Sequence, residues 1–438
     1  MRIGRQKVVV LAACLLLGSS RSVDAEVAES LSDAQKAKLA AQPPVTVSTA
    51  VGELTLPPPY ASEPTTKRSQ VVPWPEGAAP RAPDGFTVTR FAEDLDHPRR
   101  VYIAPTGEGY FVALSDDARN SPNRIVLLRD ANGDGSVDKR FEFASKANGL
   151  NQPYGMAVVD GYFYVGNVDS VMRWPYRDGM TRLEGEGERI AELPAGGYNH
   201  HWTRNLLATN DGGRLLVTVG SSSNVGEHGM EEEERRACIL AMNPDGSGEE
   251  LYASGLRNPV GMDYNPVTGE LWTAVNERDE IGDNLVPDYL TSVRRGGWYG
   301  WPYSYYGDLP DPRWGEDPHE ELASQAIVPD VPVGSHTASL GLAFYTGDKF
   351  PERYHQGAFV GQHGSWNRAK FAGYKVVFVP FDEAGRPQPP EDFLAGFIAD
   401  GDASQVYGRP VSVEVTTQGD LLVSDDDGGV IWRVSYNK

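Results

Sequence analysis

A unit of two short apolar strands, separated by a turn containing Gly or Asp, repeats along most of the chain. In each copy the second strand is more strongly apolar than the first. The six copies are HPRRVYIAPTGEGYFVAL (97–114), PYGMAVVDGYFYVGN (153–167), HWTRNLLATNDGGRLLVTVGS (201–221), NPVGMDYNPVTGELWTAVNE (258–277), SLGLAFYTGDKFPERYHQGAFVGQHG (339–364) and RPVSVEVTTQGDLLVSDD (409–426). Such a unit cannot bury both of its faces alone, whereas six arranged radially can. The pattern predicts an all-β fold, a six-bladed β-propeller with four-stranded antiparallel blades, over residues 85–438.

The residues before the repeats divide into two parts. Residues 1–25 combine a basic start, the apolar run VVVLAACLLLG and a small-residue stretch ending at Ala25, which is typical of a signal peptide. Eleven apolar residues are too few to span a bilayer as a helix. Cleavage near Ala25 predicts a periplasmic or secreted protein, while a lipoprotein anchor at Cys14 is the less favoured alternative. Residues 26–84 are rich in Pro and Ala and are expected to form a lead-in segment along the propeller.

The amino-acid composition limits the classes of partner that this chain is expected to bind. The chain has 40 basic and 61 acidic residues, a formal charge of −21, so repulsion by phosphates argues against nucleic acid as a partner. Association with a membrane is expected only if Cys14 is lipidated. After cleavage only Cys238 would remain, so a disulfide framework is excluded and a buried thiol is the expectation.

Basic and imidazole side chains gather where the repeats begin. Propellers bind ligands around the central channel, at the loops leading into the innermost strands, so these residues are expected to converge. The candidates are His200, His201, Arg257, Asn258, His336, His363, Asn367, Arg368 and Arg409. Each alone is as readily explained by a surface ion pair or a strand-edge hydrogen bond. Together they indicate an anionic ligand, with a histidine available as a base near neutral pH.

Two stretches have the composition of a Ca²⁺ loop. The run NERDEIGDN contains the oxygen donors Glu277, Asp279, Asp283 and Asn284 near a glycine. In DANGDGSVD, Asp130, Asn132, Asp134 and Asp138 match positions 1, 3, 5 and 9 of an EF-hand loop. Phe141 occupies position 12, where a bidentate acid is expected, so this loop predicts a weak or structural site; a turn that binds nothing is the alternative.

An aromatic-rich insertion follows the first of these loops. WYGWPYSYYG (298–307) contains Trp301 and Tyr303. Aromatic faces with hydroxyl groups suit stacking on a sugar ring or on a planar cofactor. The insertion is therefore a candidate part of the substrate site.

Seven stretches taken together resemble the soluble sugar dehydrogenases that depend on pyrroloquinoline quinone (PQQ), most nearly the L-sorbosone and pyranose dehydrogenases. They are NHHWTRNL, ASGLRNPVGM, NERDEIGDNLVPDYLT, YGWPYSYYG, SHTASLGLAFY, GQHGSWNR and YGRPVSV, in this order across residues 85–436. The resemblance implies oxidation of a small sugar with PQQ and Ca²⁺ as cofactors. Because the chain contains no CxxCH haem motif, electrons are expected to pass to an external cytochrome or quinone.

The resemblance also implies roles for particular residues. His201 matches the general base that takes the proton of the anomeric hydroxyl, after which hydride passes to the quinone C5. Arg257 and Asn258 match the pair that contact the quinone, with Arg257 stabilising developing negative charge. The Ca²⁺ would be held partly by the backbone carbonyls of Glu277 and Arg278.

Two positions depart from the pattern of these dehydrogenases. Arg409 matches the first of two arginines that hold PQQ carboxylates, but the second falls on Val411. The lysine expected in the fifth blade is absent, and Arg368 is the candidate substitute. His336 lies where the substrate pocket of these enzymes forms.

Two other functions are compatible with a propeller. A Ca²⁺-dependent lactonase would need Glu, Asn and Asp at the inner strand entrances, where this chain has His, Arg and Asn–Pro. A non-catalytic carbohydrate-binding propeller would use the aromatic insertion alone. A base, a cationic cluster and a calcium loop favour the oxidoreductase, because a passive binder has no use for them.

Overall fold

The computed structural model describes residues 31–104, 106–107, 109–117, 120–315 and 320–437. These residues fold almost entirely into strands, and the described α-helices are α1 (Asp33–Ala40) and α2 (Glu320–Ala323). The expected signal peptide, the Ala25 cleavage site and Cys14 lie outside the described residues. Among the residues described, no helix is long and apolar enough to cross a membrane.

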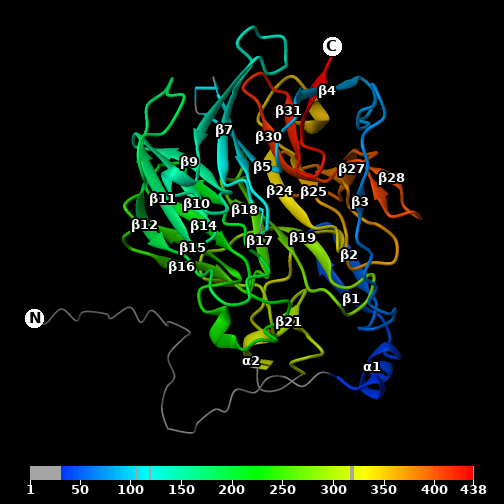
Figure 1. Ribbon diagram of the computed structural model, residues 1–438. Coiled ribbons are helices and arrows are strands. Elements are labelled where there is room, and N and C mark those ends of the chain that lie inside the picture. Colours follow the sequence, from blue (N-terminus) through cyan, green and yellow to red (C-terminus); the bar gives the residue numbers. More distant parts are fainter. Residues whose placement is uncertain (1–30, 105, 108, 118–119, 316–319, 438) are drawn as a thin grey trace, which may run out of the picture.

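Six sheets of four or more strands make up the body of the described structure (Figure 1). The first sheet contains β5 (Pro98–Ile103), β6 (Tyr110–Leu114), β7 (Arg124–Arg129) and β8 (Lys139–Ala144). The second contains β9 (Met156–Val159), β10 (Tyr162–Asn167), β11 (Ser170–Pro175) and β12 (Glu188–Glu192). The third contains β13 (Leu206–Ala208), β14 (Leu215–Val219), β15 (Cys238–Met242), β16 (Glu250–Ser254) and β20 (Gly297–Trp298).

The other three sheets follow the same plan. The fourth contains β17 (Asn258–Tyr264), β18 (Leu271–Asn276), β19 (Pro287–Ser292) and β23 (Val331–Ser335). The fifth contains β24 (Ser339–Phe344), β25 (Ala358–Gln362), β26 (Lys375–Val379) and β27 (Glu391–Leu394). The sixth contains β30 (Pro410–Val415), β31 (Leu421–Asp425), β32 (Val430–Tyr436) and β4 (Phe86–Ala92). Neighbouring strands pair antiparallel except for β20, so the expected all-β fold with four-stranded antiparallel sheets is confirmed.

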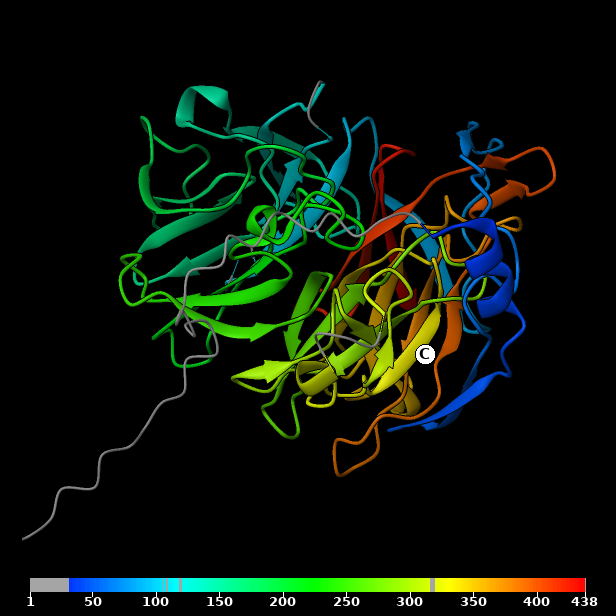
Figure 2. The same cartoon turned by 90° about the horizontal axis from the view of Figure 1, so that it is seen from below.

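Apolar side chains fill the space between each sheet and the next. Separate clusters of buried residues join the first sheet to the second, the second to the third, and so on around to the sixth and first. The cluster between the fifth and sixth sheets contains Phe359 and Trp432, both fully buried. The sheets therefore surround one centre, as Figure 2 shows from below.

The centre of the molecule is packed rather than open below its mouth. Tyr154, Val260, Leu340 and Val411 come from four sheets and form one buried cluster. Gly155 allows the second and third sheets to approach here, because a Cβ at this position would lie 2.1 Å from the Leu206 nitrogen. Val411, where the resemblance places a second cofactor-binding arginine, is therefore fully buried in the centre.

The two ends of the folded body meet in the sixth sheet. Its outer strand β4 precedes all the other body strands in the chain, yet it pairs with β32 near the C-terminus, with Phe86 opposite Tyr436 and Ala92 opposite Ile431. Trp74 packs edge-on against Trp432, with ring centroids 5.2 Å apart. Pairing of early and late strands therefore closes the ring of sheets.

The lead-in segment runs along the outside of the body. After α1 it forms the hairpin β1 (Val45–Thr49) and β2 (Gly52–Leu56), and then β3 (Gln70–Val71). β3 pairs parallel with β29 (Gln405–Val406), which also pairs with β28 (Ile398–Asp400). A second short hairpin, β21 (Ser304–Tyr305) and β22 (Leu309–Pro310), lies in the aromatic insertion.

Candidate functional site

His201 lies just before β13 and is oriented by the loop after β14. Its Nδ1 is 3.0 Å from the Ser221 carbonyl oxygen and 2.9 Å from Ser221 Oγ. Since Ser221 Oγ donates its own proton to the Ser223 carbonyl, both neighbours accept, and Nδ1 carries the hydrogen. Nε2 makes no hydrogen bond within the described part of the chain. Burial, reinforced by the positive charge of Arg257, holds the His201 pKa well below its ordinary value. The geometry leaves a neutral imidazole with a free lone pair.

Arg257 lies behind this imidazole, at the entrance to β17. The side chain is 2 % exposed, and its Nη1 donates to the Glu277 carbonyl at 2.6 Å. Its Nη2 donates to Asp279 Oδ2 at 2.8 Å. Burial disfavours the charged form of Asp279, but Arg257 and His336 outweigh it and lower the Asp279 pKa to about 2. The pair is therefore a fixed, charged element at the site.

His336 holds the other oxygen of Asp279. Its Nδ1 is 3.1 Å from Asp279 Oδ1, and its Nε2 is 2.8 Å from the Gly282 carbonyl. Both ring nitrogens therefore donate, which requires the imidazolium, and these contacts raise the His336 pKa in spite of burial. The side chain is 2 % exposed, and both of its ring nitrogens are engaged within the chain. It positions the loop that carries Asp279.

Asn224 joins these residues into one network. Its Oδ1 accepts hydrogen bonds from Arg257 Nη2 (2.9 Å) and the Asp279 amide (3.0 Å). Its Nδ2 donates to the Asp279 carbonyl at 3.2 Å, and its own carbonyl accepts from Arg257 Nε and Trp301 Nε1. One amide side chain thus fixes both members of the Arg257–Asp279 ion pair.

Asn258 provides a polar atom with no partner. Its Oδ1 is buried and makes no hydrogen bond among the described residues. A Cβ on Gly220 would lie 2.4 Å from this oxygen and 2.5 Å from His201 Cβ, so His201 and Asn258 are neighbours and a side chain at 220 would displace them. Leaving a buried oxygen unpaired costs about 1–3 kcal/mol, so this atom suits a ligand that donates a hydrogen bond.

A second charged group is formed by His363 after β25, Asp426 after β31, Arg99 in β5 and Arg409 just before β30. His363 Nε2 is 2.9 Å from Asp426 Oδ1, and Arg99 Nη1 donates to Asp426 Oδ2 at 2.5 Å. Arg409 donates through Nε to the His363 carbonyl at 3.0 Å, and its guanidinium lies 5.8 Å from the Tyr374 ring centroid. His363 and Arg99 lower the pKa of Asp426 against the effect of burial.

Two contacts connect the group around Asp426 with the group around Arg257. Arg99 lies over the ring of Trp202, the neighbour of His201, at 5.2 Å. On the other side the His363 amide donates to the Ala338 carbonyl, two residues after His336. These contacts place His201, Arg257, His336 and Arg409 in one connected set of residues, which we call the mouth.

The proposed calcium ligands in the NERDEIGDN loop already accept hydrogen bonds within the chain. The Glu277 carbonyl accepts from Arg257, and the Arg278 carbonyl accepts from the Val286 amide at 3.3 Å. Each carbonyl has a second lone pair for a cation. The side chain of Glu277 is buried, and burial raises its pKa to about 7. The Arg278 side chain points elsewhere, with Nε donating to Asp311 Oδ2 at 2.8 Å.

The remaining polar candidates of this loop contact a neighbouring loop. Both oxygens of Asp283 accept from the Ala369 amide at 3.2 Å. Arg368 Nη2 donates to Asn284 Oδ1 at 2.8 Å and Nη1 to the Ser335 carbonyl at 3.3 Å. Asp283 and Arg368 thus brace two loops against each other, and their contacts do not include Arg257 or His201.

The aromatic insertion reaches the site through Trp301, which is buried and donates to the Asn224 carbonyl at 2.9 Å. Tyr303 packs against Trp314 with ring centroids 5.0 Å apart. Trp301 therefore supports the polar network from behind.

The loop with EF-hand spacing lies on the first sheet, between β7 and β8, away from the mouth. Asp130 accepts backbone hydrogen bonds from Gly133, Asp134 and Gly135, and Asp138 accepts from Ala131 and Asn132. Asp134 accepts from Ser136 and from Asn132 Nδ2. These side chains turn toward their own backbone, as in a tight turn. Elsewhere among the described residues, ligand atoms of His363, Asp426 and Asp427 lie within 4.8 Å of one another.

The sequence analysis missed Asn224, Ser221, Arg99 and Asp426 as site residues. Three of these follow the second strand of a sheet: Ser221 and Asn224 follow β14, and Asp426 follows β31. Glu277 after β18 and His363 after β25 occupy the corresponding places. The polar residues directly after the second apolar strand of each repeat were the signal that would have found them.

The ring of antiparallel sheets defines a class of all-β proteins. Comparison with known proteins is consistent with this class. The TrAA12-like family model matches residues 80–289 and 316–437, and the chain therefore belongs to that family. The motif resemblance described above is confirmed by a pyrroloquinoline quinone-dependent sugar dehydrogenase of Hypocrea jecorina, which is 23% identical over 401 residues, 81% of this chain and 89% of that protein.

Two solved structures share the fold. The holo form of the PQQ domain of pyranose dehydrogenase from Coprinopsis cinerea superposes with a TM-score of 0.67 and 20% identity, covering 83% of this chain and 98% of the other. The calcium structure of the Trichoderma reesei Carbohydrate-Active Enzymes Family AA12 protein gives a TM-score of 0.68 and 21% identity, covering 82% and 97%.

Proposed function

We propose that this protein is a PQQ-dependent oxidoreductase that oxidises a sugar or sugar aldehyde, such as L-sorbosone, an aldose or a pyranose, and passes electrons to an external cytochrome or quinone. The observation that carries the proposal is the neutral His201, held by Ser221 with a free Nε2 beside the fixed charge of Arg257. The relatives named above support the choice of PQQ and Ca²⁺.

The residues at the mouth suit such a cofactor. Arg257, Arg99 and Arg409 supply positive charge for a polyanionic ligand, and Asn258 Oδ1 is an unpaired acceptor. The carbonyls of Glu277 and Arg278 are suitable hard donors for Ca²⁺. When bound, PQQ would supply an electrophilic quinone that accepts two electrons from the substrate.

The chain's own residues then have defined tasks. His201 Nε2 accepts the proton of the substrate hydroxyl, while Ser221 keeps the ring in the productive tautomer. Arg257 stabilises negative charge that develops beside it, and Asn224 with Asp279 holds its guanidinium in place. The packed cluster below the mouth, which includes Val260 and Val411, excludes water from beneath the site.

We further propose that the six large sheets are the blades of a six-bladed propeller, which is supported by the apolar cluster between each neighbouring pair. We also propose that residues 1–25 direct export to the periplasm or the medium. Mass spectrometry of the protein recovered from the producing cells tests the export, because cleavage at Ala25 leaves a mature N-terminus at Glu26 and processing at Cys14 leaves a lipidated cysteine. Retention of residues 1–25 would contradict it.

Reconstitution tests the activity. The purified protein is mixed with PQQ and Ca²⁺, and dye reduction is measured over aldoses, sorbosone and related pyranoses. His201→Ala should lower kcat by about 10²–10⁴ while PQQ binding persists, because a positioned base contributes this much. His355→Ala is the matched control, since His355 bonds the Phe350 carbonyl away from the mouth. Turnover without PQQ, or full activity in His201→Ala, would contradict the proposal.

A lactonase is less well supported by these contacts. Asp279 is paired with Arg257 and Asp426 with Arg99, and these ion pairs compete with a central metal for the two carboxylates. Hydrolysis of lactones by the calcium-loaded protein without PQQ would nevertheless favour that function over oxidation.

A further inference from the structure

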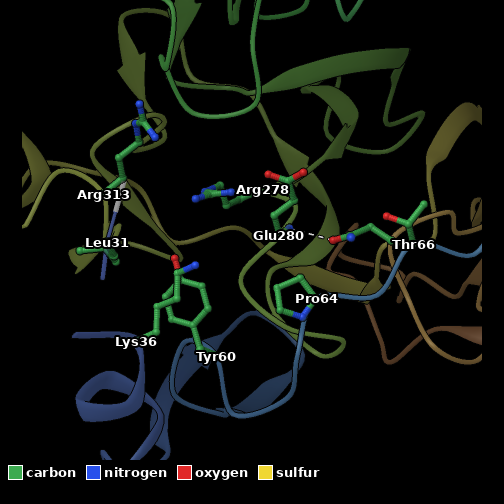
Figure 3. Close-up of a pocket in the computed structure, with 9 residues that line it drawn as sticks. Leu31, Lys36, Tyr60, Pro64, Thr66, Arg278, Glu280 and Arg313 are labelled. Atoms are coloured by element: carbon green, nitrogen blue, oxygen red, sulfur yellow. Dashed lines mark hydrogen bonds between the residues drawn. The ribbon is translucent and has the colours of Figure 1, made fainter. Parts of the chain in front are cut away.

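A cavity lies between the lead-in segment and the loops beside the mouth. Its volume is about 350 Å³, enough for a small ligand. Lys36 and Tyr60 line it from the lead-in segment, and Arg278, Glu280 and Arg313 line it from the body (Figure 3). The wall formed by residues 31–66 lies outside the stretches that match the TrAA12-like family model.

Backbone contacts hold the lead-in segment against the body. The Tyr60 amide donates to the Ile281 carbonyl at 2.7 Å, and the Asp283 amide donates to Ser62 Oγ at 2.8 Å. Farther along, the Lys67 amide donates to the Trp366 carbonyl at 2.8 Å. Since these hydrogen bonds hold the lead-in segment against the body, the wall of the cavity has a fixed position in the fold.

The cavity adjoins the candidate site through one short loop. Glu280 lines the cavity, and its neighbour Asp279 is paired with Arg257. The Glu280 amide donates to Asn367 Oδ1 at 2.7 Å, and Glu280 Oε2 is 3.5 Å from Asn224 Nδ2. A ligand in the cavity therefore contacts the same loop that carries the ion pair of the site.

The charge of the cavity is opposite to that of the molecule. The chain carries a net charge of −21, but the cavity presents Lys36, Arg278 and Arg313 against the single carboxylate of Glu280. Asp311 Oδ2 lies 2.8 Å from Arg278 Nε and neutralises part of the positive charge of Arg278. The Nε of Arg313 is buried and has no hydrogen-bond partner among the described residues. This arrangement attracts an anion, and a carboxylate matches guanidinium donors well.

We propose that this cavity binds a carboxylate-bearing sugar unit, such as a hexuronate, beside the site of oxidation. Lys36 and Arg313 bind the carboxylate, while the Glu280 carboxylate accepts hydrogen bonds from sugar hydroxyls. The inference extends the proposed function, because it assigns the substrate class of acidic saccharides to the same site.

Calorimetry on the full chain without cofactor tests the binding separately from the oxidation. D-glucuronate, D-glucose and acetate are titrated in turn. We expect glucuronate to bind at least tenfold more tightly than glucose and acetate, and the affinity to fall at higher salt. Lys36→Ala and Arg313→Ala should each weaken binding about tenfold, while Arg313→Lys retains most of it because it keeps the charge.

Arg182→Ala is the control, since the Arg182 side chain is 73% exposed and pairs with Glu184. Thermal midpoints of all variants show that the fold is intact. Equal affinity for glucose and glucuronate, equal affinity for acetate, or unchanged binding in both alanine variants would overturn the proposal. Because no PQQ is present, failure of the dye assay would leave this result untouched, and failure here would leave the proposed oxidation untouched.

Discussion

At the scale of single residues, the site depends on side chains that hold other side chains. Asn224 contacts Arg257 and Asp279 at once, and Ser221 sets the tautomer of His201. Neither residue needs to touch a substrate. Their effect on the reaction is to fix the position of the guanidinium and of the imidazole lone pair.

Replacing Asn224 by Ala should therefore loosen the Arg257–Asp279 pair. The lost acceptor leaves Arg257 Nη2 with one partner, so the free energy of unfolding should fall by about 1–3 kcal/mol. kcat/KM should fall more than tenfold, measured by dye reduction alongside urea unfolding. Asn243→Ala is the control, because Asn243 bonds Ser247 on an exposed hairpin. Unchanged activity in Asn224→Ala would show that Arg257 does not depend on it.

The pH dependence of the activity follows from His201. Its pKa lies well below the ordinary 6.5 because burial and Arg257 disfavour the imidazolium, so the neutral base persists as pH falls through that value. We expect kcat/KM to remain high down to pH values below 6.5 and to fall only at more acidic pH. A profile of kcat/KM from pH 4 to pH 8 measures this. An acid limb centred above 6.5 would contradict a buried, neutral base.

Sequence reasoning reached some site residues and missed others for a physical reason. His201, Arg257 and Arg409 stand at fixed places before an inner strand, so the repeat predicts their convergence. Asn224 and Asp426 lie in the loops after second strands; the repeat marks these loops, but the contacts that their side chains make could only be seen in the structure. His336 was found, but its two hydrogen bonds and its burial could only be seen in the structure.

At the scale of elements, the inner strands were the predictable part of the fold. The repeats begin within a few residues of β5, β9, β13, β17, β24 and β30. The outer strands gave a weaker signal, because they are half exposed and mix charge with apolar residues, as in ERIAE of β12 and EDFL of β27. At 130–138 the motif spacing predicts a tight loop, and the structure adds that its carboxylates bond the backbone of the loop.

The close approach of the second and third sheets at Gly155 leads us to expect that a side chain there lowers stability. In Gly155→Ala the new methyl group would lie 2.1 Å from the Leu206 nitrogen and 2.6 Å from the Asn205 carbonyl carbon, so the second and third sheets must separate. We expect the free energy of unfolding to fall by about 1–3 kcal/mol, as for other overpacked cores, measured by urea denaturation. Gly196→Ala is the matched control, because a Cβ there meets nothing within 4 Å. Equal stability of the two variants would mean that this contact relaxes freely.

At the scale of the whole molecule, stability rests on the closure of the ring. β4 pairs with β32 along six residues of the later strand, Ile431 to Tyr436, and Trp432 is fully buried against the lead-in residue Trp74. The repeat in the sequence predicts β31. It does not predict that β4 belongs to the same sheet, because β4 lies at the other end of the body in sequence.

Trp432→Ala should therefore weaken closure. Removing a fully buried indole from a packed core costs about 3–5 kcal/mol, which lowers the urea midpoint. Leu251→Ala is the control, since Leu251 is 53% exposed on β16. If both variants unfolded at the same urea concentration, the sixth sheet would not be limiting for stability.

The same closure imposes an order on biosynthesis. β4 leaves the ribosome before any other strand of the body, but its pairing partner β32 emerges last. Until then β4 has no partner strand, and β31, which pairs with β30, has one free edge, so other chains can join these strands and the nascent protein is exposed to aggregation. Completion of the native state must wait for release of the full chain, so chaperones that shield strand edges should raise the yield of folded protein more than any change in the mature site.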